Sequence, residues 1–222
     1  MKTSLTAAQI FDQLVERRSD LASCRTDFLA AFDLLQGSYA RGGKLLLAGN
    51  GGSAADAEHI AGELLKGFRS TRPLSEAKRQ ALRAAWGEAA EAMISRLEEP
   101  LPAIALTSHP AFGTAFGNDA SAEWTFAQHL LGLGRSGDVF LAISTSGRSR
   151  NILHAARLAK AFGMAVIGFT GRSGGDLLPL CDVCLRVEQD KVFLIQEGHL
   201  PLYHALCWAL EEHFFPGTRR DV

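Results

Sequence analysis

Short, almost wholly apolar runs alternate with longer segments of helical periodicity along most of this chain. The apolar runs cover residues 44–48, 103–108, 138–143, 165–170 and 182–187. Strands that lack a polar face are typical of a parallel sheet that helices cover on both sides. The pattern therefore predicts an α/β fold. We expect a three-layer α-β-α sandwich around a central five-stranded parallel sheet, of the doubly wound, flavodoxin-like kind.

The segments between the strands have the spacing of helices. Helices are predicted over residues 53–67, 74–98, about 120–132, 149–162 and 195–214. Residues 5–40 carry one apolar stripe, interrupted around Ser19, which indicates two N-terminal helices within residues 1–41. Ser4 or Thr6 is the expected N-cap of the first. No internal repeat or linker divides the chain, so a single domain over residues 1–222 is expected.

Composition excludes several classes of partner and compartment. The formal net charge of −1 gives no electrostatic reason to expect nucleic acid or an anionic membrane surface. The sequence has no run of eighteen apolar residues and no hydrophobic segment typical of a signal peptide near its start, so a cytoplasmic location is expected. Cys181 and Cys184 have C-x-x-C spacing, but no second pair accompanies them. We interpret them as reduced, buried strand residues.

A glycine-rich turn, Gly49-Asn50-Gly51-Gly52-Ser53, joins the first strand to the next helix. Glycines let the backbone approach a ligand closely, and the free N–H groups at a helix start suit an anion. The turn lacks the Gly-Lys-Ser of a P-loop and the spacing of a dinucleotide-binding fingerprint. It predicts an anion site, with a simple tight turn as the alternative.

A second polar turn, Ser144-Thr145-Ser146-Gly147-Arg148-Ser149, directly follows the strand 138–143. Ligands of open α/β sheets bind at the carboxyl ends of the strands. The alternative is helix capping, for which one hydroxyl would be enough. Four hydroxyls beside free backbone N–H groups favour a phosphate site.

Two pairs of side chains are candidates for metal binding or proton transfer. His59 and Glu63 share a helix face about 6 Å apart, although such a pair is also common on a solvated face. Gln196 and His204 on the last helix are about 12 Å apart along its axis, so they would reach one ion only if their side chains converged. His199, between them, is interpreted as an exposed or capping residue.

Together these stretches resemble the SIS (sugar isomerase) domain family, and within it the isomerases of heptose phosphates. The resemblance covers most of the chain from residue 40 to 214. The matching stretches are residues 49–64, 102–108, 117–121, 137–152, 163–175 and 195–206.

The resemblance implies an SIS domain with aldose–ketose isomerase activity. It implies interconversion of sedoheptulose 7-phosphate and D-glycero-D-manno-heptose 7-phosphate through an enediol, a step of heptose biosynthesis for lipopolysaccharide. It also implies a homotetramer with sites between subunits. By the same resemblance, Glu63 and His204 form the proton-transfer pair, and one zinc per subunit is bound. The implied metal ligands are His59, Glu63, Gln196 and His204. The implied contacts to the sugar phosphate are Asn50, Gly51, Gly52, Ser53, Asn118, Asp119, Ser144, Thr145, Ser146, Ser149 and Gln196.

The chain departs from the family pattern at three places. Residues 71–100 form a helical insertion where the family has a short loop. Phe193 stands where the isomerases usually carry Asp, and Arg148 where they usually carry Asn.

Two alternatives follow from the same family. The segment 211–222 has some likeness to non-catalytic SIS proteins that bind a replication initiator, although those lack the full His/Glu/Gln/His set. An isomerase or sensor for another sugar phosphate is the second alternative.

Overall fold

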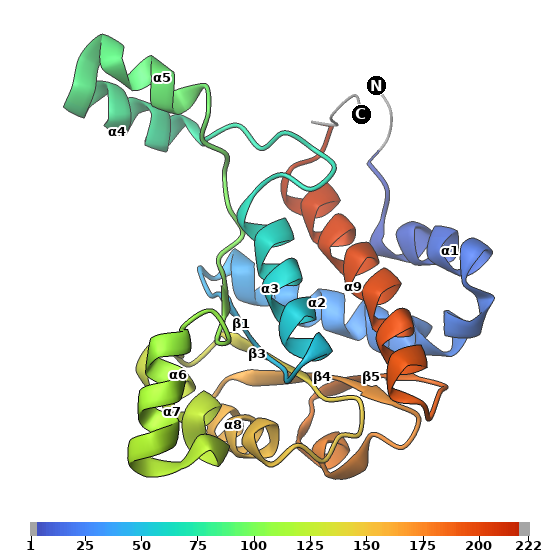
Figure 1. The fold of residues 1–222 in the computed structure, drawn as a ribbon. Helices are drawn as coiled ribbons and strands as arrows, with labels where there is room; N and C mark the ends of the chain where they lie inside the picture. Colours follow the sequence, from blue (N-terminus) through green and yellow to red (C-terminus); the bar gives the residue numbers. More distant parts are fainter. Residues whose placement is uncertain (1–3, 218–222) are drawn as a thin grey trace.

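The computed structural model describes residues 4–217; the end of the segment 211–222 thus lies outside the described residues. All five predicted strands pair in one parallel sheet of order β2-β1-β3-β4-β5 (Figure 1). The strands are Leu45–Ala48 (β1), Ala103–Ala105 (β2), Val139–Ile143 (β3), Ala165–Gly171 (β4) and Val183–Val187 (β5). The predicted α/β sandwich with a five-stranded parallel sheet is confirmed.

The strand order creates a position for a ligand between β1 and β3. From β1 the chain crosses to β2 on one side, and it then returns to build β3, β4 and β5 on the other. In open α/β sheets the ligand crevice forms where the order reverses in this way. Leu47 pairs with Leu141 and Ala48 with Ala142, so the segments after both strands emerge at the same sheet edge.

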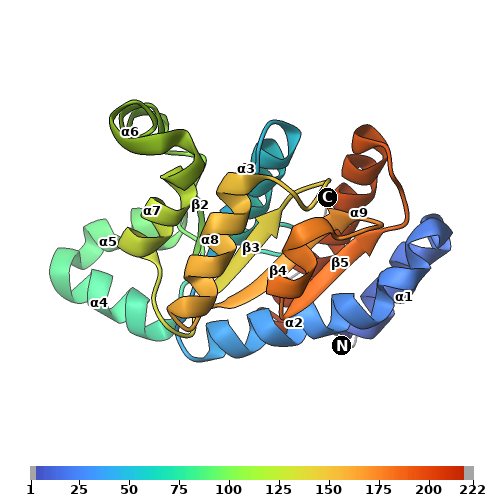
Figure 2. The same cartoon turned by 90° about the horizontal axis from the view of Figure 1, so that it is seen from below.

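Alternate residues of each strand enter two different cores, as the pleat of a strand requires. Leu45 and Leu47 pack with α1, α2, α3 and α9, whereas Leu46 and Ala48 pack with α7 and α8 (Figure 2). The helices of the first face are Ala7–Arg17 (α1), Arg25–Ala40 (α2), Gly52–Leu65 (α3) and Val192–Phe214 (α9); those of the second are Thr125–Leu133 (α7) and Arg150–Ala161 (α8). Both faces of the sheet are therefore buried, which explains the continuous apolar runs.

The N-terminal helices follow the predicted division. Thr6 caps α1, because its hydroxyl accepts from the backbone N–H of Gln9 while the Gln9 side chain accepts from the N–H of Thr6. After Arg18, a 3₁₀ turn over Ser19–Cys24 leads into α2.

The structure corrects three predicted helices. The single helix predicted over 74–98 is two helices, Glu76–Trp86 (α4) and Ala90–Ile94 (α5), because Gly87 adopts a positive φ of 55° between them. The helix predicted at about 120–132 begins only at Thr125. It follows helix Pro110–Phe116 (α6), a π-helical turn over Gly117–Ser121 and a 3₁₀ turn over Ala122–Trp124. The last helix, predicted from 195, begins at Val192.

Other expectations concern the thiols and the membrane. Cys184 is buried on β5 and Cys181 is partly buried just before it, and both are free thiols.

Between residues 4 and 217, no helix combines the length and the hydrophobicity that crossing a bilayer requires.

An ion pair between Arg72 and Glu211 lies wholly inside the protein. Glu211 accepts from Arg72 Nε at 2.8 Å and from the backbone N–H groups of Phe68 and Arg69 at 2.8 and 2.7 Å. The Arg72 guanidinium also donates to the carbonyl oxygens of Leu64 and Glu63 at 2.7 and 3.1 Å, so it satisfies the end of α3. One buried pair therefore joins the end of α3, the following loop and α9.

Replacing Glu211 by Gln is expected to lower the free energy of unfolding by about 3–5 kcal/mol, because it leaves the Arg72 guanidinium buried without a counter-charge. Urea unfolding followed by circular dichroism measures this. The matched control is Glu188→Gln, which removes the exposed pair with Arg172 and is expected to cost about 1 kcal/mol or less. Equal urea concentrations at the midpoint of unfolding for the two variants would contradict the prediction.

His199 is fully buried, which corrects its interpretation as an exposed or capping residue. Its Nε2 donates to the carbonyl oxygen of Thr170 at 3.2 Å, and Nδ1 makes no hydrogen bond with any described residue. Burial lowers the pKa of His199 to about 4, although the bond to Thr170 opposes the shift. The side chain is therefore neutral in the folded protein.

Acidification is expected to destabilise the protein through His199. The unfolded chain binds this proton near pH 6.5 and the folded chain only near pH 4. The free energy of unfolding should therefore fall by up to roughly 3 kcal/mol as the pH drops through this window. Urea unfolding at pH 7.5, 6, 5 and 4 measures how steeply the free energy of unfolding changes with pH. It is measured for the wild type and for His199→Gln, whose side chain retains a hydrogen-bond donor and does not titrate. The prediction fails if both proteins show the same slope.

Candidate functional site

The two polar turns predicted to bind a ligand lie side by side at the switch point of the sheet. A pair of side-chain amides joins them. Asn50 Nδ2 donates to Asn151 Oδ1 at 3.0 Å, and Asn151 Nδ2 donates to Asn50 Oδ1 at 2.9 Å. Asn151 also accepts from the N–H of Ile152 in the first turn of α8, so the glycine-rich turn is tied to the start of that helix. Both turns thus lie next to each other at the carboxyl edge of the sheet.

The glycine-rich turn has a backbone that side chains would obstruct. Gly51, at the N-cap of α3, has a φ of +55°. A Cβ on Gly49 would lie 2.3 Å from the carbonyl oxygen of Ser53. A Cβ on Gly52 would lie 2.5 Å from Gln196 Nε2, so the absence of a side chain at Gly52 lets the Gln196 amide reach the turn. Gln196 therefore lies against the glycine-rich turn.

The second turn presents hydroxyls that do not cap the helix behind them. Ser149 occupies the N-cap of α8 but makes no side-chain capping bond. Ser144 donates to Ser149 Oγ at 3.1 Å, and Ser146 Oγ accepts from the N–H of Arg148 at 3.2 Å. Within residues 4–217, the hydroxyl protons of Thr145, Ser146 and Ser149 have no acceptor among the hydrogen bonds of the structure. The capping alternative is therefore disfavoured, and these donors lie beside the free N–H groups at the start of α8.

A cavity of mixed charge adjoins Arg148. It measures about 430 Å³, and Arg150, His154 and Arg157 line it together with Glu123 and Asp176. Arg150 pairs with Glu123 at 3.1 Å, but its side chain is largely exposed. The guanidinium groups outnumber the carboxylates, and this positive charge adds to that of the α8 N-terminus and favours a phosphate at the turn.

Further along α3, His59 is oriented by a chain of hydrogen bonds. Tyr203 donates its hydroxyl proton to Asp56 Oδ1 at 3.2 Å. Its oxygen therefore accepts from Nδ1–H of His59, which lies 3.0 Å away. This bond orients the ring so that Nε2 points towards Glu63, as outer partners orient metal-binding histidines.

His59 Nε2 faces a carboxylate. Glu63 Oε1 is 3.3 Å away, and Lys66 holds the other oxygen of Glu63 at 3.0 Å. The His204 ring is 5.0 Å from the His59 ring, and its Nε2 is buried without a hydrogen-bond partner among the described residues. His59, Glu63 and His204 therefore form a cluster of side chains of the kinds that bind zinc.

The environment of His204 keeps it neutral. Burial, and then the neighbouring His59, lower the pKa of His204, and Glu63 only partly opposes them. A neutral imidazole can bind a metal or accept a proton at neutral pH. The side chain of His59 is 43% exposed and that of Glu63 only 13%, so the cluster opens to solvent from the side of His59.

The four residues expected to bind a metal lie at two different positions along the packed helices α3 and α9. Gln196 contacts Gly52 at the start of α3, whereas His204 contacts His59 seven residues further along. Seven residues of helix correspond to about 10 Å, in agreement with the separation expected from the sequence. Among residues 4–217, no three His, Cys, Asp or Glu side chains form a closed metal-binding set. The structure thus brings three of the four residues together and places Gln196 at the glycine-rich turn.

Three further residues from the sequence analysis lie outside this cluster. Asn118 and Asp119 are exposed in the π-helical turn, where Asn118 donates to Asp119 at 3.0 Å. Neither has a hydrogen bond to a polar turn in the described part of the chain. Phe193, in the first turn of α9, is 57% exposed.

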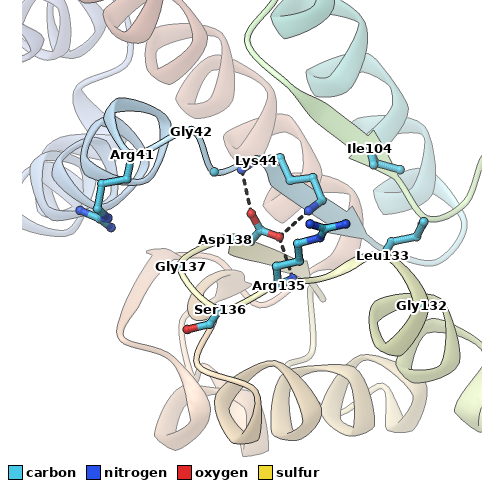
Figure 3. Close-up of a pocket in the computed structure, with 11 residues that line it drawn as sticks. Arg41, Gly42, Lys44, Ile104, Gly132, Leu133, Arg135, Ser136, Gly137 and Asp138 are labelled. Carbon is cyan, nitrogen blue, oxygen red and sulfur yellow. Dashed lines mark hydrogen bonds and ion pairs between the residues drawn. The ribbon is translucent and has the colours of Figure 1, made fainter.

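A separate cavity of about 540 Å³ lies at the opposite edge of the sheet (Figure 3). Asp138 accepts there from Lys44 Nζ at 2.6 Å and from the backbone N–H of Arg135 at 2.8 Å. The carboxyl ends of α2 and α7 border this cavity, and the carbonyl groups at helix ends repel anions. Lys44 is already paired with Asp138 there, so this cavity has a weaker claim to a phosphate than the turn at the start of α8.

Sequence reasoning missed Asn151, Tyr203 and Asp56. Asn151 lies two residues after the last hydroxyl of the second turn, and Tyr203 is adjacent to His204, so both were within stretches already singled out. Asp56 precedes His59 by three residues and therefore shares its helix face. Their partners are more than 100 residues away in sequence, and no local pattern indicates such pairings.

The sequence was compared with models of protein families and with known proteins, and the matches agree with the fold and the site described above. The sequence model of the SIS domain family matches residues 9–93 and 89–171. The chain belongs to the SIS domain family.

Several relatives carry one particular name. The chain is 45% identical over 178 residues to a phosphoheptose isomerase of Burkholderia pseudomallei strain 1710b, covering 80% of this chain and 77% of the relative. It is 40% identical over 177 residues to that of Nitratidesulfovibrio vulgaris Hildenborough, covering 80% and 72%. The solved phosphoheptose isomerase GmhA of Neisseria gonorrhoeae superimposes with a TM-score of 0.71 at 32% identity, covering 91% and 95% of the two chains.

Proposed function

We propose that this protein is an aldose–ketose isomerase that interconverts sedoheptulose 7-phosphate and D-glycero-D-manno-heptose 7-phosphate. One observation carries the proposal. A phosphate-type turn and a glycine-rich turn meet at the switch point, and α3, the helix that starts at the glycine-rich turn, carries His59 and Glu63 beside His204. The similarity to phosphoheptose isomerases over 80% of the chain supports the same activity.

The second turn is proposed to hold the phosphate. Ser144, Thr145, Ser146 and Ser149 offer hydroxyl donors beside the N-terminus of α8. A phosphate held far from the reacting carbons supplies binding energy that orients the substrate. The sugar then extends along the glycine-rich turn, where Asn50, Gly51, Gly52, Ser53 and Gln196 are proposed to contact it, and Asn118 and Asp119 are further proposed contacts.

Glu63 and His204 are proposed to move the protons. Isomerisation transfers a proton between C1 and C2 through an enediol, and a carboxylate can remove it from one carbon and return it to the other. Neutral His204 is placed to exchange a proton with the sugar oxygens. Each such group contributes typically about 10²–10⁴-fold to the rate. Lys66, held against Glu63, keeps the carboxylate oriented.

A zinc ion is proposed at His59, Glu63 and His204, with Gln196 as the further ligand implied by the family. The support is chemical: His59 Nε2 and Glu63 Oε1 face each other at 3.3 Å, and His204 Nε2 is buried without a partner among the described residues. Bound there, zinc would polarise the sugar carbonyl as a Lewis acid. The side chains are of the types that bind zinc, although no three His, Cys, Asp or Glu side chains of the described residues lie close enough together to hold an ion.

A homotetramer with sites between subunits is also proposed. Two observations support it. His59 is partly exposed, so a neighbouring subunit would cover it. Asn118 and Asp119 make no hydrogen bond to either polar turn among the described residues, so they would contact the sugar bound to a neighbouring subunit.

Glu63→Gln is expected to reduce turnover of sedoheptulose 7-phosphate at least about 10²-fold while the fold is retained. NMR of the purified protein with substrate measures formation of heptose 7-phosphate, and circular dichroism checks the fold. Glu58→Gln, an exposed residue of the same helix, is the matched control and should keep wild-type turnover. A folded wild type without turnover would exclude the heptose phosphates and favour another sugar phosphate or a non-catalytic role.

The purified protein is expected to contain close to one zinc per chain, measured by atomic absorption. His59→Ala and His204→Ala should each lose most of it, because each removes a proposed ligand nitrogen. His154→Ala is the control on α8. Zinc content that is unchanged in both variants would contradict this site, whatever the activity of the wild type.

A further inference from the structure

The cavity of mixed charge, about 430 Å³ in volume, runs along one face of α8. α8 contributes Arg150, Leu153, His154 and Arg157 to its lining, at the spacing of residues that share a helix face. Figure 2 shows α8 in the outer layer of the fold. Among the described residues that line the cavity, none belongs to the hydroxyls of the second turn or to the proposed proton-transfer pair. The cavity is therefore a separate feature from the proposed isomerase site.

The cavity collects guanidinium groups that have few other partners. Arg148 and Arg157 have no ion pair with any residue between 4 and 217, and Arg150 pairs with Glu123. The side chains of that pair are 75% and 48% exposed, so water screens it and Arg150 is free to turn towards a ligand. Arginine binds phosphate oxygens through parallel hydrogen bonds. Three guanidinium groups spread over about 10 Å of helix suit two linked phosphates better than one.

An aromatic stack lies beside these cations. The indole of Trp124 stacks on His154, with 3.9 Å between the ring centroids and 14° between the planes. Trp124 is nevertheless 49% exposed, so the indole face that turns away from His154 is open to solvent. An open indole is a platform on which a nucleobase stacks, and His154 joins this platform to the cavity.

Two carboxylates give the cavity acceptors as well as donors. Glu123 comes from the 3₁₀ turn Ala122–Trp124 and Asp176 from the 3₁₀ turn Gly175–Leu180, and both turns pack against α8. Asp176 has no ion pair with any residue that the structure describes. A carboxylate repels phosphate but accepts hydrogen bonds from hydroxyls, as the acidic residue of dinucleotide sites does from ribose. The mixed charge therefore fits a ligand that carries hydroxyls beside its phosphates.

We propose that this cavity binds a nucleoside diphosphate. Arg148 and Arg157 hold the diphosphate, the open face of Trp124 stacks on the base, and Asp176 accepts from the ribose hydroxyls. The volume is within the range of about 300–1,000 Å³ that is usual for small-molecule sites. The proposal does not depend on the isomerase activity, because these residues are not those proposed to bind or convert the sugar phosphate.

Isothermal titration calorimetry tests the ligand class. ADP, GDP, CDP, UDP and pyrophosphate are titrated into the full chain without added divalent cations, so that the guanidinium groups meet free anions. At least one nucleotide is expected to bind with a Kd below about 100 μM. It should bind at least about 10-fold more tightly than pyrophosphate, because the base and the ribose add contacts. Failure of all four nucleotides to bind, or equal affinity for pyrophosphate, would overturn the proposal.

Substitutions in the cavity locate the bound nucleotide. Arg157→Gln and Trp124→Ala should each weaken its binding at least about 10-fold, because they remove a phosphate contact and the stacking platform. Trp124→Ala should leave the affinity for pyrophosphate within about threefold of the wild type, because pyrophosphate has no base to stack. A nucleotide that both variants bind like the wild type lies elsewhere, which would overturn the proposal.

Two matched controls come from an arm formed by the helical insertion. The arm, residues 74–98, stands away from the body of the protein (Figure 1), and Pro73 and Glu98 pair in a two-residue bridge where it departs and returns. Arg96 and Trp86 are exposed residues of this arm, so Arg96→Gln and Trp86→Ala should bind the nucleotide as the wild type does. Circular dichroism checks that all four variants keep the fold. Equal losses in the controls and in the cavity variants would overturn the proposal.

The ribose contact has a test of its own. The wild type should bind the nucleotide at least about fivefold more tightly than its 2′,3′-dideoxy form, because that form leaves the carboxylate without a donor. Asp176→Ala should reduce this preference to less than about twofold, since the acceptor is absent for both ligands. A preference that is unchanged in the variant would overturn the contact between Asp176 and ribose.

Discussion

The buried contact between Arg72 and Glu211 connects most of what is distinctive in this protein. Two opposite charges removed from water are stable only when every donor and acceptor finds a partner. Here the guanidinium uses its spare donors on the last carbonyl groups of α3, and the carboxylate uses its spare lone pairs on the loop after that helix. The pair therefore fixes the end of the helix that carries Glu63, and it also fixes the point from which the arm departs.

The position of the site follows from the topology and needs few specialised residues. Parallel pairing of β1 with β3 places two strand ends at one edge, and the reversal of strand order opens a space between them. Small residues then allow a close approach at the first turn, and hydroxyls supply donors at the second. α3 and α9 pack side by side, so ionisable groups about two to three turns along both helices meet.

The sequence predicted most of the scaffold because the signals are local. Five apolar runs identify the strands, and the turns at 49–53 and 144–149 are continuous in sequence. Long-range pairings such as Asn50 with Asn151 depend on which strands are neighbours, and no periodicity contains that information. His199 was misjudged for a related reason: its spacing places it on the inner face of α9 only once the helix has packed against β4. The break at Gly87 was missed because glycine is also tolerated inside helices at modest cost.

The bridge between Pro73 and Glu98 has a consequence for the history of the chain. Because the arm begins and ends at neighbouring points, its presence leaves the path of the surrounding backbone unchanged. A segment of this kind can be acquired or discarded in one genetic event without a compensating change in the sheet. The domain can therefore change the length of this segment while the sheet and both polar turns keep their positions.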